Sequence, residues 1–541
     1  MKKGFVLFGV VLLLATIMLI SGCGNLKDVA IDDKPAPATG KAENTLVLGR
    51  GGDSRGLDPA IVTDNESGKV TVNIFDTLVE FEPDGTAVRA ALAADWSVSK
   101  DGTVWTFNLR RGVKFHDGAE LTAAAVIANV ERWMNMDNPL NSGKCKYWSY
   151  MFNGYAPDSI VTKVEATGDY QVQFTLREPY APFIQNLAMF PFAIASPAAL
   201  EKYGADFYEN PVGTGPFKFA EWIKDDKITL VRNDAYWGET AKVDALVFRS
   251  IPDDSARFLE LQAGAIDMMD GLNPDDLVAA GANDRLQVFP RPGMDVGYLA
   301  MNTAKKPFNN KEVRRAINHA VNKKAIIDDL YAGLAKPAKN PLPPAMWGYN
   351  DDVEGYEYDP EKAKAMLAQA GYPGGFKTTL WYMPVSRAYI PQGQKIAEAI
   401  RTDLAAVGIE VEIATFDWDI YLEQAEKGEH DMILMGWTGD NGDPDNFIYT
   451  LLDKDNAVKG SSSNYAFYKN NQVHDLLIRA QREINRDNRS ALYRQAQAII
   501  HEDAPWVPLV HSTQPLVLMK YVRGYNPHPT GMEQLNTVSV R

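Results

Sequence analysis

Residues 396–413 read IAEAIRTDLAAVGIEVEI, and this stretch indicates the fold class. Its first part places an apolar side chain every three or four positions, at Ile396, Ile400, Leu404 and Val407. That spacing predicts a helix with one buried face. Gly408 is suited to end the helix, and residues 409–413 then alternate apolar and charged side chains as a half-buried strand does. A helix that leads directly into a strand is an α/β unit.

Earlier segments give the same mixture of strands and helices. Residues 96–100 and 103–109 alternate in polarity around Asp101-Gly102, which predicts a β-hairpin closed by a type I′ turn. Thr122 stands where an N-cap is expected, before apolar residues at helical spacing over 123–136.

The second half of the sequence is richer in helices. Asp359-Pro360-Glu361 predicts the start of a helix that ends at Ala370 before Gly371. Further helices are expected near residues 311–321, 323–332, 472–483 and 488–502. The fold class is therefore α/β with mixed sheets, and we find no internal repeat.

Composition and charge exclude several classes of protein. The chain has 541 residues, of which 45% are hydrophobic and 23% charged, so it is neither disordered nor a protein with many membrane spans. Its formal net charge is −15, which makes nucleic acid a poor candidate partner.

The amino terminus has the pattern of an export signal. Lys2 and Lys3 precede an apolar run over 5–20, and small residues then precede Cys23. The pattern resembles a bacterial lipoprotein signal, which implies cleavage of residues 1–22 and acylation of Cys23. A plain transmembrane anchor is the alternative, but the run is shorter than the ~20 residues that span a bilayer.

We therefore expect an extracytoplasmic protein held to the cell membrane by lipid, on the periplasmic side if the organism has an outer membrane. Residues 23–44 would be the lipidated cysteine and a flexible tether. Cys145 is the only other cysteine, so no disulfide within the chain is expected.

A search for catalytic motifs gives no candidate. None of the seven histidines belongs to a His-Glu-x-x-His motif, and neither a Gly-x-Ser-x-Gly elbow nor a phosphate-binding loop is present. No cluster of His, Cys and carboxylates has the spacing of metal ligands. We expect a binding protein with neither cofactor nor metal, and the alternative from a different class is a lipid-anchored hydrolase.

Two blocks in the first half of the chain carry a family resemblance. The first is made of ALA at 91–93, Trp96, Asp101-Gly102, WTFNLR at 105–110, FHDG at 115–118 and LTA at 121–123. The second is NPVGTGPF at 210–217. Together they resemble the peptide/nickel family of extracytoplasmic solute-binding proteins, over essentially all of the chain after the tether.

That resemblance implies a two-lobed clamp of the periplasmic-binding-protein type II, with a hinge between the lobes and an extra N-proximal domain. The first lobe would be discontinuous, the extra domain would be inserted into it, and the second lobe would follow. The expected boundaries are about 45–75, 213–291 and 510–541 for the first lobe, 76–212 for the insertion and 292–509 for the second lobe.

Three further blocks resemble the dipeptide-binding branch of this family. They are 338–360 with MWGYNDD at 346–352, MPVSR at 383–387, and GWTGDNGDPDNF at 436–447. In that branch an Asp after Gly-Trp binds the ligand amine, and an Arg after Met-Pro-Val binds its carboxylate. The resemblance assigns these roles to Asp440 and Arg387.

The chemistry of a dipeptide is consistent with these two residues. An isolated carboxylate suits the ammonium end and a guanidinium fork suits the carboxylate end. Read without the resemblance, Asp440 lies in a turn where carboxylates commonly cap local amides, and Arg387 is a solvated arginine. The other candidate binding residues are Trp437, Tyr389, Gly436, Thr438 and Gly439, for which ordinary packing is the competing interpretation.

The expected function is capture of dipeptides or short peptides and their delivery to the permease of an ABC importer, by a monomer. The alternatives within the family are an oligopeptide, haem, a glutathione-like peptide or a nickel chelate as the ligand.

Overall fold

The computed structural model describes residues 44–141 and 145–540. The expected signal peptide, the acylation site Cys23 and the tether up to residue 43 lie outside these ranges. Within them, no helix combines the length and the apolar character that a bilayer span requires. Cys145 is a free, buried thiol.

A twelve-stranded mixed sheet connects most of the described chain. The order of its main path is β16 (Glu410–Ala414), β15 (Lys377–Trp381), β17 (Met432–Thr438), β13 (Asp295–Met301), β18 (Trp506–Met519), β11 (Met268–Met269), β1 (Thr45–Arg50), β10 (Ala245–Ser250), β9 (Lys227–Arg232) and β8 (Phe217–Ile223). β12 (Leu286–Pro292) and β14 (Ala335–Pro337) also pair with β18. Parallel pairs, such as β1 with β10 and β15 with β16, occur beside antiparallel ones, as the sequence predicts.

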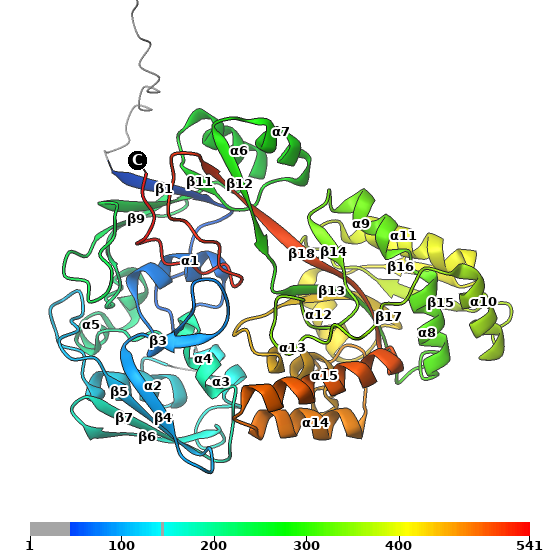
Figure 1. Cartoon of the computed structure of the whole chain (residues 1–541), viewed down its shortest axis with the longest axis horizontal. Helices are drawn as coiled ribbons and strands as arrows, with labels where there is room; N and C mark the ends of the chain where they lie inside the picture. Colours follow the sequence, from blue (N-terminus) through cyan, green and yellow to red (C-terminus); the bar gives the residue numbers. More distant parts are fainter. Residues whose placement is uncertain (1–43, 142–144, 541) are drawn as a thin grey trace, which may run out of the picture. The chain divides into compact units, whose positions relative to one another are not determined.

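Strand β18 takes part in two halves of this sheet. Its first residues pair with β13, and its later residues pair with β12 and β11 (Figure 1). Between these two halves, Ser512 donates its backbone N–H to the Asp295 carboxylate over 2.7 Å, and the Ser512 carbonyl accepts the N–H of Gly293 over 3.1 Å. A side chain at Gly293 would collide with that carbonyl, because its Cβ would stand 2.4 Å from the oxygen. The crossing between the two halves is therefore tightly packed.

Three hydrophobic clusters form the interior. One is built from residues 294–510, and a second joins residues 46–75 to segments within 193–288 and 516–538. The third is built from residues 60–194. β18 contributes Leu509 and Val510 to the first cluster and Leu516 and Val517 to the second, so one strand stabilises two cores.

The third cluster has its own antiparallel sheet. The strands are β4 (Ala93–Val98), β5 (Val104–Leu109), β7 (Gln171–Leu176) and β6 (Val161–Gly168), in that order. Helices α2 (Ala123–Met134), α3 (Lys146–Met151) and α4 (Phe183–Leu187) bury side chains in the same cluster, and β2 (Val79–Phe81) pairs with β3 (Val88–Ala90) beside it.

The remaining helices belong to the other two clusters. Those of residues 46–288 are α1 (Asn65–Ile74), α5 (Pro197–Tyr203), α6 (Asp254–Ala263) and α7 (Leu277–Ala282). Those of residues 294–510 are α8 (Lys311–Ala320), α9 (Lys323–Leu330), α10 (Pro360–Gln369), α11 (Gly393–Ala406), α12 (Trp418–Glu426), α13 (Asp445–Leu452), α14 (Asn471–Arg482) and α15 (Arg486–Asp503). The predicted helices of the second half are confirmed within a few residues.

One local prediction is wrong in detail, and another is confirmed in position only. The hairpin of β4 and β5 forms, but its turn is not type I′: of the central pair only Gly102 has a positive φ, 73°, and Ser99 donates its N–H to Val104. The Asp101 side chain accepts hydrogen bonds from both Ser99 and Thr103, which stabilises this wider loop. Thr122 is the N-cap of α2 by position, but its side chain makes no capping hydrogen bond.

Candidate functional site

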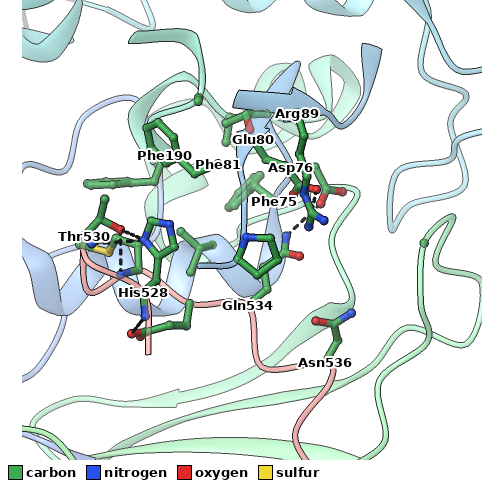
Figure 2. A pocket seen from close by; sticks show the side chains of 18 of the residues that line it. Phe75, Asp76, Glu80, Phe81, Arg89, Phe190, His528, Thr530, Gln534 and Asn536 are labelled. Carbon is green, nitrogen blue, oxygen red and sulfur yellow. Dashed lines mark hydrogen bonds and ion pairs between the residues drawn. The ribbon is translucent and has the colours of Figure 1, made fainter. Parts of the chain in front are cut away.

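A cavity of about 560 Å³ lies beside the C-terminal end of α1. Its wall is formed by residues from 71–90, 188–193, 236–239 and 526–537, together with Arg110 and Asp440. Figure 2 shows Phe75, Phe81 and Phe190 around it, with Asp76, Glu80, Arg89 and His528 among them. Five of the lining residues are carboxylates and two are arginines, so the wall favours a cationic group.

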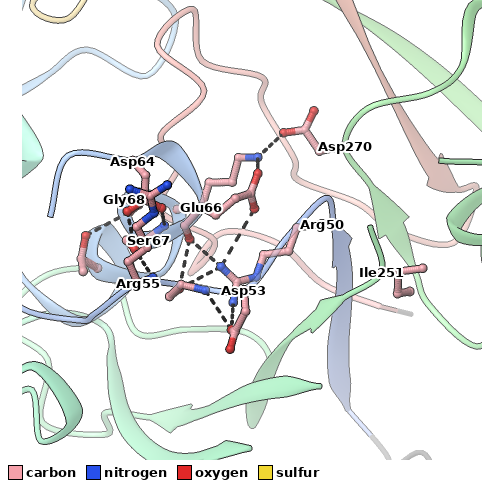
Figure 3. Close-up of polar contacts among 12 residues, drawn as sticks. Arg50, Asp53, Arg55, Asp64, Glu66, Ser67, Gly68, Ile251 and Asp270 are labelled. Atoms are coloured by element: carbon pink, nitrogen blue, oxygen red, sulfur yellow. Dashed lines mark hydrogen bonds and ion pairs between the residues drawn. The ribbon is translucent and has the colours of Figure 1, made fainter. Parts of the chain in front are cut away.

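A network of buried and half-buried charges fixes the helix behind this wall (Figure 3). Arg50, at the end of β1, donates to the Glu66 carbonyl over 2.6 Å. Lys69 of α1 bridges the carboxylates of Glu66, at 2.8 Å, and Asp270, at 2.7 Å. These contacts hold α1 against the sheet, and the chain that leaves α1 carries Asp76 into the cavity wall.

Two of the carboxylates in the wall already have strong partners. Asp76 accepts hydrogen bonds from four side chains: Thr214 at 2.7 Å, Trp237 at 2.9 Å, Tyr236 at 3.0 Å and Gln534 at 3.2 Å. Burial raises the pKa of Asp76 in spite of them. Glu80 pairs with Arg89 at 3.0 Å, and burial raises the pKa of Glu80 to about 7. Both carboxylates are therefore already bonded to side chains of the protein itself.

Asp440 differs from Glu80 because its carboxylate has no cationic partner, and it differs from Asp76 because it accepts two long hydrogen bonds from side chains instead of four. It accepts one hydrogen bond from the Tyr147 hydroxyl and one from the Asn446 side-chain amide, each over 3.3 Å. No ion pair of Asp440 with a lysine, arginine or histidine is present in the described part of the chain. Burial raises the pKa of Asp440 to about 6. Asp440 is half-buried in the cavity wall, and a partly buried carboxylate without a counter-ion is a site for a cation.

The loop that carries Asp440 is rigidly built. It leaves β17 at Thr438, and Gly439 donates its N–H to the Met294 carbonyl over 2.7 Å. A Cβ at Gly439 would come within 2.4 Å of the Phe447 ring, so only glycine fits. Further along the loop, Arg489 donates two hydrogen bonds of 2.8 Å to the Asp443 carboxylate, and both side chains are buried.

The segment with Arg387 lies against the same strand. Tyr389 packs its ring on Gly436 of β17, where a Cβ would stand 2.2 Å from the ring. The Tyr331 hydroxyl donates to the Tyr389 carbonyl over 2.8 Å. Burial raises the pKa of Tyr389 to about 12, although Arg387 acts in the opposite direction.

Arg387 itself is exposed and does not line the cavity. Its backbone exchanges hydrogen bonds with Ile390, and its guanidinium donates to the Ser386 carbonyl over 3.1 Å. The structure thus brings the segments of Asp440 and Arg387 to one end of β17, without placing both side chains in the wall of the cavity.

The other residues predicted from the sequence lie at this strand end. Trp437 is half-buried and donates its indole N–H to Asn446 over 3.0 Å, and Thr438 is exposed opposite Asp295. Gly436 and Gly439 make room for neighbouring rings. Sequence reasoning did not identify Tyr147, Asp76 or Glu80, because none lies in a motif and their contribution depends on contacts between distant segments.

Three potential metal ligands meet outside the cavity. Asp453, Asp455 and His474 each bring one ligand atom within 4.8 Å of the others. The sequence did not indicate this cluster, because His474 lies on α14, well after the two aspartates. His474 Nδ1 stands 3.1 Å from the Asp453 carboxylate, and this pair accounts for the arrangement without a metal.

Comparisons with known proteins agree with the fold. A family model, "Bacterial extracellular solute-binding proteins, family 5 Middle", matches residues 87–459. The chain is 40% identical to the dipeptide-binding protein of Escherichia coli (strain K12), covering 92% of this chain and 94% of the relative. It is 36% identical to the heme-binding protein A of Haemophilus influenzae, covering 98% of each.

A solved structure shows the same architecture. It is the periplasmic binding protein DppA from Helicobacter pylori in complex with the peptide STSA. The TM-score is 0.77 at 41% identity, covering 92% of this chain and 98% of that one. The fold is therefore that of a two-lobed periplasmic binding protein, as the sequence predicts.

Proposed function

We propose that this chain, which belongs to family 5 of the bacterial extracellular solute-binding proteins, captures dipeptides and other short peptides for an ABC importer. The observation that carries the proposal is the Asp440 carboxylate, which lies in the cavity wall without a counter-ion. A peptide ammonium would supply the missing charge. Relatives named for peptide binding support this choice.

In this proposal Arg387 binds the peptide carboxylate. Its guanidinium is exposed, donates to the Ser386 carbonyl and interacts with the neighbouring Tyr389 hydroxyl, and it forms no ion pair with a carboxylate among the described residues, so it can bind a ligand carboxylate. The packing of Tyr389 on Gly436 brings the Arg387 segment to the strand end that leads to Asp440. Each peptide residue adds ~3.3–3.6 Å when extended, so two anchors at a fixed separation would select ligand length.

We propose the same domain boundaries as the sequence analysis. The cluster of residues 294–510 supports a second lobe at 292–509, and the clusters around 46–288 and 60–194 support a first lobe with an inserted domain. Residues 193–207 pack with the first-lobe cluster, so this part of the insertion lies against that lobe.

We also propose that the protein is a lipid-anchored extracytoplasmic binding protein rather than an enzyme. The amino-terminal pattern ending in Cys23 supports the anchor, and the relatives named above are binding proteins. The permease of the importer would be its partner, and the protein would act as a monomer.

Calorimetric titration of the purified protein tests the ligand. Alanyl-leucine should bind, and Asp440→Asn should weaken this binding at least about thirtyfold, because loss of one partner of a buried charge pair typically costs ~2–5 kcal/mol. Parallel titrations with tripeptides, pentapeptides and haem show whether this protein binds one of the alternative ligands of the family. Binding of haem alone, or alanyl-leucine binding that is unchanged in Asp440→Asn, would contradict the proposal.

A further inference from the structure

Asn446 contacts Asp440 from two sides. Its side-chain oxygen accepts the backbone N–H of Asp440 over 3.0 Å, and its side-chain nitrogen donates to the Asp440 carboxylate over 3.3 Å. The same oxygen accepts the Trp437 indole N–H over 3.0 Å. One amide therefore binds the backbone and the side chain of Asp440, and also the ring of Trp437.

Chemistry fixes which way this amide faces. The indole N–H of Trp437 and the backbone N–H of Asp440 can only donate, so the amide oxygen must point at them. The amide nitrogen then necessarily faces the Asp440 carboxylate. The hydrogen bonds from Trp437 and from the Asp440 backbone therefore assign the oxygen and the nitrogen of the Asn446 amide, and the nitrogen donates to the Asp440 carboxylate.

Asn446 is itself held in place. It is buried in the first turn of α13, directly after Asp445, whose backbone N–H donates to Asp443 over 3.0 Å. Asp443 in turn receives two hydrogen bonds from Arg489. The helix start is therefore tied to α15, and the Asn446 amide is a fixed point against which the Asp440 carboxylate is set.

We propose that Asn446 is a positioning residue that orients the Asp440 carboxylate for a ligand ammonium. The inference rests on the proposed function. One oxygen of Asp440 is directed to Asn446, and the other, which meets only the long hydrogen bond from Tyr147, is presented to the ligand. A carboxylate fixed in this way needs no reordering when the cation binds.

The test compares alanyl-leucine with N-acetyl-alanyl-leucine, which lacks the ammonium. Asn446→Ala should weaken alanyl-leucine binding about tenfold and the acetylated form less than about threefold, since only the first uses the oriented carboxylate. Asn464→Ala is the matched control, because Asn464 is also a buried side-chain amide with three hydrogen bonds, none of them to Asp440. It should not change the ratio of the two affinities.

A double-mutant cycle separates positioning from loop damage. In an Asp440→Asn background, Asn446→Ala should weaken alanyl-leucine binding by less than about threefold, because the group that it positions is gone. If Asn446→Ala fails to fold, Trp437→Phe removes one of the two donors that orient the amide, and it should reduce the same affinity ratio by a smaller factor.

Two outcomes would overturn the inference. Equal weakening of both ligands by Asn446→Ala, or full additivity in the cycle, would mean that Asn446 only supports the loop. Failure of the proposed function is a different result, because Asp440→Asn by itself would then leave alanyl-leucine binding unchanged.

Discussion

The raised pKa of Asp440 predicts that peptide binding depends on pH. The ammonium binds the ionised carboxylate, and burial places the pKa of this group at about 6 in the ligand-free protein. At pH 5 about one molecule in ten would carry the ionised form, so the affinity for alanyl-leucine should be about tenfold lower than at pH 7. The bound ammonium favours the carboxylate, so binding near pH 6 should release about half a proton.

Calorimetry at pH 5, 6 and 7, in two buffers with different ionisation enthalpies, measures both the peptide affinity and the number of protons released on binding. Tyr147 faces Asp440 from α3. The other acidic and basic side chains that line the cavity are Asp76, Glu80, Arg89, Arg110, Glu239, His528 and Glu533. Of these, Glu80 has a pKa near 7, so Glu80→Gln is the matched control and should retain the pH dependence.

Asp440→Asn should remove this pH dependence. The raised pKa also sets how Asp440 affects folding stability. Because the folded-state pKa of about 6 lies above the unfolded value of 3.8, the contribution of Asp440 to the free energy of unfolding falls as pH rises through about 6. Because peptide affinity is higher at pH 7, a peptide should raise the melting temperature more at pH 7 than at pH 5. Equal affinities at pH 5 and pH 7, with no proton released, would refute the assignment of the ammonium to Asp440.

Four further predictions concern the carboxylate anchor, the lipid anchor, closure of the lobes and folding stability. Arg387→Ala should weaken alanyl-leucine binding at least about tenfold and abolish its advantage over the dipeptide amide; a change below about threefold would place the carboxylate anchor elsewhere. Cys23→Ser should release the protein from membranes or make it accumulate uncleaved, without changing peptide affinity, and unaltered lipid labelling would contradict this. Saturating dipeptide should lower the radius of gyration in small-angle scattering if the lobes close over it. Arg489→Met should lower the free energy of unfolding by ~3–5 kcal/mol in denaturant titrations, because Asp443 would remain buried and unpaired.

The parts of the fold that depend on neighbouring residues could be predicted from the sequence. The helix and strand of 396–413 appear as α11 and β16, since apolar spacing and a glycine stop are local signals. The turn at Asp101 was predicted with the wrong type, because the hydrogen bonds from Ser99 and Thr103 favour a wider loop over the two-residue turn that Asp-Gly suggests.

The site could be predicted only in part. Asp440 was selected by its motif, and the structure adds that its carboxylate lies in a cavity wall. Its partner Tyr147 lies 293 residues earlier in the chain, and no spacing rule connects residues so far apart. The same is true of Asp76, which is 458 residues from its partner Gln534. Such contacts come from the tertiary fold, which sequence patterns do not encode residue by residue.

Strand β18 has a consequence for how the chain is made. It lies near the end of the sequence, yet it pairs with β11 and β13 and packs in two clusters. Asn73, near the start, is bonded to the Glu533 carbonyl, 460 residues away. During synthesis neither of these two clusters can be completed until residues 506–519 have emerged, whereas the cluster of residues 60–194 does not depend on β18. A chain truncated before Trp506 would lack the last strand of both clusters at once.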